Sequence, residues 1–423
     1  MKRAVAGVLF LVACGGSDND NNNGTVDASG SGGTHDAAID APHQSGDYFT
    51  IPMTTPDGTF WGPKVTIGGT QFVMDLDTGS TTIGVAGSTC TQCTGVSPLY
   101  TPGAGATDAM KTSQTQYADN SGWSGEIYDD VVGFGVGDAT INLALVDITK
   151  QTQFFDGNVY QGIFGLGDTR NAEPNTDAYM NKQVAANAFK NVMAFEMCGM
   201  NDGQGTGTMW LGGFDASKAS AAPVYTPLIA ITNNQPFYAV DITAMSIGAT
   251  SVGTGAAAFQ EPVVDTGTTY FYLPTTIFKA TTNAIKGSSG YTTLFGTSAL
   301  KEDGCVTGTN VTAAMVDAML PPMTITMPGV NGGPNVVINA PPMQSYFYDG
   351  GNGQFCYALG DGGTQDATTM GDAIMRNFVT VIDIGNNQVG WAPDSGCGPA
   401  PAARSTTAHK MTHPHPPKRH HRV

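Results

Sequence analysis

The sequence predicts a mostly β protein built from two similar halves that share one site. Three observations support this prediction. A chain of 423 residues with 56 Gly and 24 Pro turns often and is too long for one small core. The triplet Asp-Thr-Gly occurs at 77–79 and at 265–267, each time after apolar residues and before a hydroxyl residue. The two triplets lie 188 residues apart, as expected if each half supplies one of them.

The two triplets would bring two carboxylates together. Carboxylates held about 3 Å apart cannot both ionise, so Asp77 and Asp265 would share one proton. The ionised member can deprotonate a water, and the protonated member can hydrogen-bond a carbonyl. Hydrolysis of an unactivated amide needs these two actions.

The residues that follow each aspartate are suited to support it. The threonines can hydrogen-bond across the two loops, and the glycines let the backbone approach closely. The hydroxyl residues behind them can donate to the outer carboxylate oxygens. These supporting residues are Thr78, Gly79, Ser80, Thr266, Gly267 and Thr268.

These loops resemble those of the pepsin-like aspartic proteases, and the resemblance extends from about Tyr48 to Cys397. It includes two apolar-plus-Gly segments, at 162–167 and 369–371, and a C-terminal signature that covers 369–383 and 386–392. The family threads the first segment behind the first catalytic loop, and the second segment is its counterpart. The resemblance implies a bilobal acid protease fold with the active cleft between the lobes, endopeptidase activity at acid pH, and no cofactor or metal.

The first 47 residues read as an export segment and a tether. Residues 1–14 have a basic start and a short apolar run, which indicates a signal peptide. Leu11 to Cys14 resembles a bacterial lipobox, so we expect lipidation of Cys14; a plain secretory signal is the alternative. Residues 15–47 are rich in Gly, Asn and Asp and contain no Lys or Arg, which predicts a disordered tether. We therefore expect no basic inhibitory prosegment.

The folded body should begin near Tyr48, with a first lobe at 48–213 and a second at 214–397. Residues 60–67 and 71–77 read as a hairpin that ends on Asp77. Strand alternation puts Asp75 on the same face as Asp77. In the family the matching position lines the S1 pocket and is usually apolar. Asp75 would then favour a basic P1 residue or raise the pKa of the aspartate pair; a carboxylate bonded locally or turned to solvent is the alternative.

Tyr117 lies between two strand-like runs and matches the tyrosine of the family's flap, the hairpin that closes over the substrate. Where the family often has a tryptophan that supports this tyrosine, the chain has Gly84, and Trp123 would take over that packing. Phe154, Phe155 and Tyr160 are candidates for an apolar S1 wall, or equally for core residues.

For the remaining segments the sequence predicts only strands and helices with approximate bounds. Residues 194–198 and 208–213 should pair as strands at the end of the first lobe. Residues 237–247 read as strands leading to Asp265. Helices are expected at 176–189 and, after Pro274, at 275–285.

The seven cysteines leave six for three bridges once Cys14 is assigned to the N-terminus. Cys90 and Cys93 form a pair that could be redox-active or metal-binding, but no second such pair or nearby His accompanies it. The resemblance implies Cys90–Cys93, Cys305–Cys356 and Cys198–Cys397 as structural bridges.

Histidine and charge exclude several functions. All seven His lie outside residues 48–397, so neither a Ser-His-Asp triad nor a His-based zinc site can form in the body. The body carries 11 Lys+Arg against 29 Asp+Glu, which should repel nucleic acid. Residues 398–423 are rich in Pro, His and basic residues and predict a disordered tail.

We therefore expect a monomer that acts on proteins or peptides and meets the membrane only through its lipid. The main alternative is a non-catalytic, inhibitor-like binding protein on the same fold, although both triplets are intact. A structural or adhesive surface lipoprotein is a third interpretation.

Overall fold

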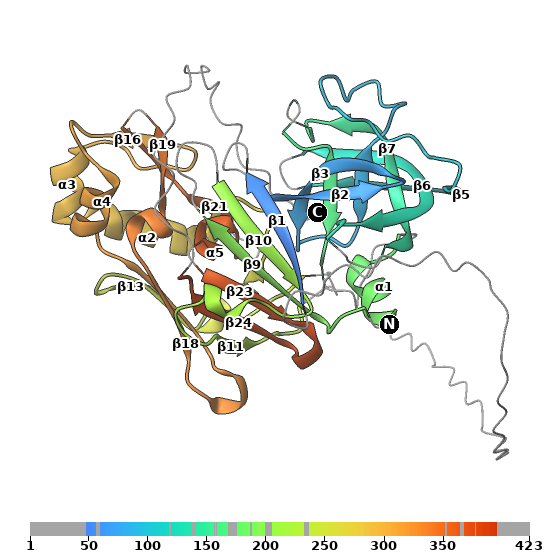
Figure 1. Cartoon of the computed structure of the whole chain (residues 1–423). Coiled ribbons are helices and arrows are strands. Elements are labelled where there is room, and N and C mark those ends of the chain that lie inside the picture. Colours follow the sequence, from blue (N-terminus) through green and yellow to red (C-terminus); the bar gives the residue numbers. More distant parts are fainter. Residues whose placement is uncertain are drawn as a thin grey trace, which may run out of the picture. The chain divides into compact units, whose positions relative to one another are not determined.

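The computed structural model describes residues 48–55, 60–117, 120–136, 140–155, 157, 159–167, 176–186, 188–198, 205–231, 237–351, 353–363, 368–376 and 378–395. The expected signal segment, tether and basic tail lie outside this part of the chain, as do Cys14 and Cys397. Within it the protein is mostly β, as predicted, with the strands arranged in four sheets (Figure 1).

The first half contains ten strands and one α-helix among the described residues. They are β1 (Phe49–Thr55), β2 (Gly62–Ile67), β3 (Thr70–Asp77), β4 (Ile83–Ala86), β5 (Thr107–Gln116), β6 (Gly122–Gly133), β7 (Ile141–Thr152), β8 (Gly162–Gly165), α1 (Tyr179–Ala185), β9 (Val192–Cys198) and β10 (Gly205–Leu211). The predicted hairpins at 60–77 and around Tyr117 are therefore present, and so is the predicted β9–β10 pair.

The second half is also β-rich but carries more helix. Its strands are β11 (Val224–Pro227), β12 (Ala244–Ile247), β13 (Thr250–Thr254), β14 (Val263–Val264), β15 (Phe271–Pro274), β16 (Cys305–Thr307), β17 (Met323–Met327), β18 (Val336–Ala340), β19 (Phe347–Gly351), β20 (Gln354–Tyr357), β21 (Leu359–Gly363), β22 (Thr369–Met370), β23 (Phe378–Asp383) and β24 (Gln388–Pro393). Its helices are α2 (Thr275–Lys286), α3 (Ser289–Phe295), α4 (Ala313–Met319) and α5 (Asp372–Met375).

One sheet joins the two halves. Its strand order is β11-β24-β23-β9-β10-β1-β2-β3-β8-β4-β7-β6-β5, so β11, β24 and β23 of the second half continue the sheet beside β9 of the first half (Figure 1). Strands β9 and β23 pair there, with Glu196 opposite Val379 and Ala194 opposite Val381. Ala194, Val379 and Val381 are buried, so this contact between the halves is apolar as well as hydrogen-bonded.

A short strand passes between two others in each half. In the first half β8 runs parallel to β3 and antiparallel to β4. In the second half β22 runs parallel to β14 and antiparallel to β15. The two segments predicted to thread behind the aspartate loops thus occupy equivalent places. A methyl group at Gly165 would lie 2.5 Å from the Thr82 nitrogen, and one at Gly371 would lie 2.1 Å from the Thr268 oxygen. Glycine is needed at both crossings.

Two sequence predictions were too long. The helix expected at 176–189 spans only Tyr179–Ala185. Asp177 stays outside it because its carboxylate accepts the Ala144 amide of β7 at 3.0 Å. The strands expected at 237–247 reduce to β12, and the segment before it makes only isolated bridges, from Ala239 to Ile229 and to Val263. Helix α2 agrees with its prediction and buries Ile277, Thr281 and Ile285 at a spacing of four residues.

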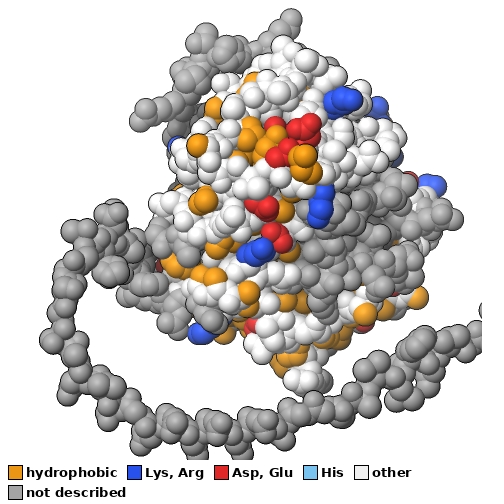
Figure 2. Space-filling model, turned by 90° about the vertical axis from the view of Figure 1, so that its right-hand side faces the viewer, with side chains coloured by type: hydrophobic (Ala, Val, Ile, Leu, Met, Phe, Trp, Pro, Cys, Tyr) orange, Lys and Arg blue, Asp and Glu red, His pale blue; other side chains and the backbone are white. Residues whose placement is uncertain are grey.

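The surface carries few charges. Figure 2 shows one face, on which uncharged side chains predominate and acidic and basic groups are scattered. Among the described residues, only a few large apolar side chains are strongly exposed, and Met110 on β5 is the most exposed of them at 86%. None of the described helices combines the length and the apolar character that a membrane span requires.

Two threonines link the halves at the aspartate loops. The Thr78 and Thr266 amides each donate to the other residue's hydroxyl oxygen at 3.0 Å. Each hydroxyl in turn donates across the interface, Thr78 to the Val264 carbonyl at 2.9 Å and Thr266 to the Leu76 carbonyl at 2.8 Å. Both side chains are buried, so water cannot replace these four bonds.

Replacement of Thr78 by Ala should therefore destabilise the protein strongly. It leaves the Thr266 amide and the Val264 carbonyl buried without partners, at a cost of about 2–4 kcal/mol in the free energy of unfolding. Thr78→Ser keeps the hydroxyl and should cost about 1 kcal/mol or less. The exposed Thr250→Ala on β13 serves as a control. Denaturant unfolding midpoints check this, and equal midpoints for the Ala and Ser variants would contradict it.

Candidate active site

Asp77 ends β3, and Asp265 directly follows β14. Both carboxylates are fully buried. The Gly79 amide donates to Asp77 Oδ1 at 2.7 Å, and the Gly267 amide donates to Asp265 Oδ1 at 2.9 Å. The outer oxygens accept from hydroxyls, as the sequence predicted. Ser80 donates to Asp77 Oδ2 at 2.5 Å, and Thr268 donates to Asp265 Oδ2 at 2.7 Å.

The two loops face each other closely. A methyl group on Gly79 would lie 2.7 Å from Asp265 Oδ1, and one on Gly267 would lie 2.5 Å from Asp77 Oδ1. Each glycine therefore borders both carboxylates, and no larger residue would fit. Two buried carboxyl groups that border the same two glycines are placed to act together as base and acid.

Two further carboxyl groups lie near this pair. Asp75 on β3 is only 1% exposed. Asp372, the first residue of α5, is fully buried, and its amide donates to the Thr268 carbonyl at 2.8 Å. Burial raises the pKa of Asp372 well above its usual value, and the charges of Asp75 and then Asp265 raise it further, while Arg376 opposes them. Asp372 is therefore held in its neutral form in acid.

Asp372 and Arg376 were not identified as site residues from the sequence. Both lie within the C-terminal stretch that resembles the family, and Asp372 directly follows Gly371 of the second threading segment. Burial lowers the pKa of the Arg376 guanidinium to about 10, so it keeps its charge at acid pH. Only the tertiary structure brings α5, with its buried carboxyl and guanidinium, next to the loop that carries Asp265.

Tyr117 and Trp123 meet on the β5–β6 hairpin, which the sequence predicts to be the flap. Tyr117 follows β5, Trp123 lies on β6, and the indole N–H donates to the tyrosine oxygen at 2.9 Å. The tyrosine ring stacks on Phe154 with centroids 5.6 Å apart and planes 14° apart. A methyl group on Gly84 of β4 would come within 3.1 Å of Ile148, which belongs to the same apolar cluster as Tyr117 and Trp123. Trp123 contacts Tyr117 directly from the same hairpin.

The three aromatic candidates for a pocket wall differ in exposure. Phe154 is fully buried and Tyr160 is nearly so, both in one cluster with Tyr117 and Trp123. Phe155 is half-buried and packs on the same cluster. Tyr160 donates its hydroxyl to the Phe154 carbonyl. Phe154 is therefore a core residue that carries the flap tyrosine, and Phe155 is the more accessible ring.

The cysteines agree with the predicted bridges as far as they are described. Cys90–Cys93 and Cys305–Cys356 are bonded. Cys198 is also in a disulfide, and its predicted partner Cys397 lies outside the described residues. The sulfur of Cys198 lies close to Glu196 and Asp394, a grouping that resembles a metal site. Because that sulfur is oxidised, it offers no thiolate to a metal.

Comparison with known proteins agrees with this geometry. A family model described as eukaryotic aspartyl protease matches residues 60–394. The chain is 26% identical to a beta-secretase of Strongylocentrotus purpuratus over 350 residues, 75% of this chain and 63% of that protein. It is 28% identical to rhizopuspepsin-2 of Rhizopus niveus over 265 residues, 60% of this chain and 65% of that protein.

An aspartic protease of Phaffia rhodozyma is 24% identical over 340 residues, 79% of this chain and 76% of that protein. The chain spans less than two thirds of the length of the beta-secretase and of rhizopuspepsin-2. The family model nevertheless covers both aspartate loops, the β5–β6 hairpin and the short strands β8 and β22. The chain therefore belongs to the eukaryotic aspartyl protease family.

Proposed function

We propose that the protein is an aspartic endopeptidase that hydrolyses peptide bonds in proteins or peptides at acid pH. The observation that carries the proposal is the mirrored pair of loops, in which each aspartate is held by its own glycine amide and hydroxyl. The reciprocal threonine bonds keep the two loops at a fixed separation. Such preorganisation is what acid–base catalysis on a bound water requires.

In this proposal a water binds between Asp77 and Asp265. The ionised carboxylate takes a proton from the water, which attacks the peptide carbonyl, while the protonated carboxyl hydrogen-bonds the carbonyl oxygen. A proton then passes to the leaving amine. The shared proton and its pKa values belong to the pair rather than to either residue.

The surrounding residues are assigned to substrate. Tyr117 closes over the bound chain, and Phe155 and Tyr160 border an apolar pocket beside it. The lobes would extend over 48–213 and 214–397, with the substrate between them. The protein acts as a monomer and needs no cofactor.

The full-length protein should hydrolyse an unfolded protein with a maximum at acid pH and be blocked by pepstatin. Pepstatin mimics the tetrahedral intermediate of such a pair, so it should bind far more tightly than substrate. Asp77→Asn and Asp265→Asn should each lower the rate about 1,000-fold or more, because the pair loses its base or its acid.

The matched control is Asp129→Asn, a half-buried aspartate on β6 outside both loops, which should keep wild-type activity. Hydrolysis rates of the wild type and of these variants, measured from pH 2 to pH 8, test the proposal. A rate maximum above pH 8, or no cleavage by folded protein at any pH, would overturn the proposal and favour a binding protein on this fold.

Asp75 is proposed to act on the pH profile. Its near-complete burial and its influence on Asp372 favour an electrostatic role over direct contact with a P1 side chain. An ionised Asp75 raises the pKa of the neighbouring Asp372, so Asp75→Asn removes a negative charge from the surroundings of the catalytic carboxyl groups. Both limbs of the pH–rate profile should then move about one pH unit toward acid.

Cleavage-site mapping provides the second readout for Asp75→Asn, and P1 preference should stay unchanged. A loss of preference for basic P1 residues, with an unmoved pH profile, would show instead that Asp75 lines the S1 pocket.

The protein is also proposed to be exported and held at a membrane by a lipid on Cys14. The two described disulfides support export, because such bonds persist in oxidising compartments. The Leu11 to Cys14 motif supports lipidation. Fractionation of cells that express Cys14→Ala should find the protein released from the membrane; continued membrane association would exclude the lipid anchor.

A further inference from the structure

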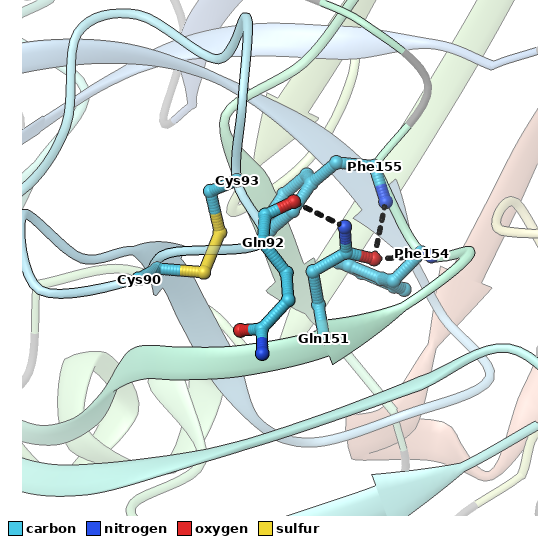
Figure 3. Close-up of a disulfide and its surroundings, with 6 residues drawn as sticks. All are labelled: Cys90, Gln92, Cys93, Gln151, Phe154 and Phe155. Carbon is cyan, nitrogen blue, oxygen red and sulfur yellow. Dashed lines mark hydrogen bonds between the residues drawn. A yellow bond between two sulfur atoms is a disulfide. The ribbon is translucent and has the colours of Figure 1, made fainter.

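The side chain of Gln151 lies between two segments that are distant in sequence (Figure 3). Gln151 is near the end of β7. Its amide nitrogen donates to the Gln92 carbonyl at 2.8 Å. Its amide oxygen accepts the Phe154 amide at 2.8 Å and the Phe155 amide at 3.5 Å. One side chain thus joins the disulfide turn to the aromatic segment.

The Cys90–Cys93 turn holds the Gln92 carbonyl, which accepts the hydrogen bond from Gln151, in a fixed position. Gln92 lies inside the four-residue ring closed by Cys90 and Cys93 (Figure 3). The Cys90 amide also donates to the Gly87 carbonyl at 3.0 Å. Both cysteines are buried in a small apolar cluster, against which Phe155 packs. The Gln92 carbonyl therefore has little freedom to follow a moving partner.

The aromatic segment, Phe154 and Phe155, packs against Tyr117, the predicted flap tyrosine. Phe154 is held at both ends of its backbone, by Gln151 at the amide and by Tyr160 at the carbonyl. Its ring stacks on Tyr117, whose oxygen accepts from Trp123. A shift of the Phe154 backbone would therefore move the surface on which Tyr117 rests.

We propose that Gln151 is a positioning residue for substrate binding: by anchoring Phe154 and Phe155 to the Cys90–Cys93 turn, it sets the place of the pocket wall and of the flap tyrosine. This inference rests on the proposed function. Gln151 touches neither Asp77 nor Asp265. Its loss should weaken substrate and transition-state binding alike, which raises KM and leaves kcat unchanged.

Two variants of Gln151 separate its hydrogen bonds from its size. Gln151→Met keeps the length but makes neither bond, and KM for peptides with a large apolar residue at the cleaved bond should rise about tenfold. The hydrogen bonds that Gln151→Glu can make depend on pH. A glutamic acid below about pH 4 can donate to Gln92 and accept from Phe154, whereas the carboxylate above that pH repels the Gln92 carbonyl.

Gln151→Glu should therefore resemble wild type at about pH 3 and resemble Gln151→Met at about pH 5.5. A merely structural role would give no such dependence. Gln354→Met, an exposed glutamine on β20 in the second half, is the matched control and should leave KM unchanged. The full-length protein is used throughout. An unchanged KM in Gln151→Met, or a Gln151→Glu that matches wild type at both pH values, would overturn the proposal.

If Gln151→Met does not fold, the pH dependence of Gln151→Glu decides alone. Hydrogen exchange provides a readout that needs no activity, so failure of this inference and of the proposed function can be told apart. The Phe154 and Phe155 amides should exchange about tenfold faster in Gln151→Met than in wild type, and equal exchange would show that Gln151 does not anchor them.

Discussion

The structure depends on the reciprocal hydrogen bonds between Thr78 and Thr266. Each amide donates to the opposite hydroxyl, and each hydroxyl donates to a carbonyl before the opposite aspartate. The arrangement satisfies four buried backbone groups at once, which no packing of apolar side chains could do. It also fixes the separation of the two aspartates, because each lies one residue from its threonine. The polar link that holds the halves together therefore also defines the distance between the carboxylates.

The strands behind the loops explain why two halves with different sequences make equivalent loops. A short central strand lies parallel to the strand before each aspartate and antiparallel to the strand after it. This crossing forces the chain to turn sharply at the aspartate. It also requires glycine where the segments approach most closely, as at Gly165 and Gly371.

Several buried carboxyl groups make the fold suited to acid. Burial and then the charge of Glu126 raise the pKa of Asp147 to about 6. Burial and the nearby Asp394 raise the pKa of Glu196, and burial does the same for Asp372. Because these pKa values are higher in the folded protein, their contribution to stability is complete below about pH 4 and is lost as the pH rises through the folded-state values. Stability and the proposed catalysis thus favour the same pH range.

The sequence by itself determined the features that local patterns encode. The two Asp-Thr-Gly loops, the hairpins around Asp77 and Tyr117, helix α2 after Pro274, and the absence of His from the body could all be read from neighbouring residues. The tertiary structure alone decided contacts between distant segments: Phe154 stacked on Tyr117, Asp372 behind Asp265, and Gln151 between the disulfide turn and Phe154. Local chemistry restricts what a segment can form, but a side chain's partner depends on which strands the fold brings together, and a single sequence does not contain that information in readable form.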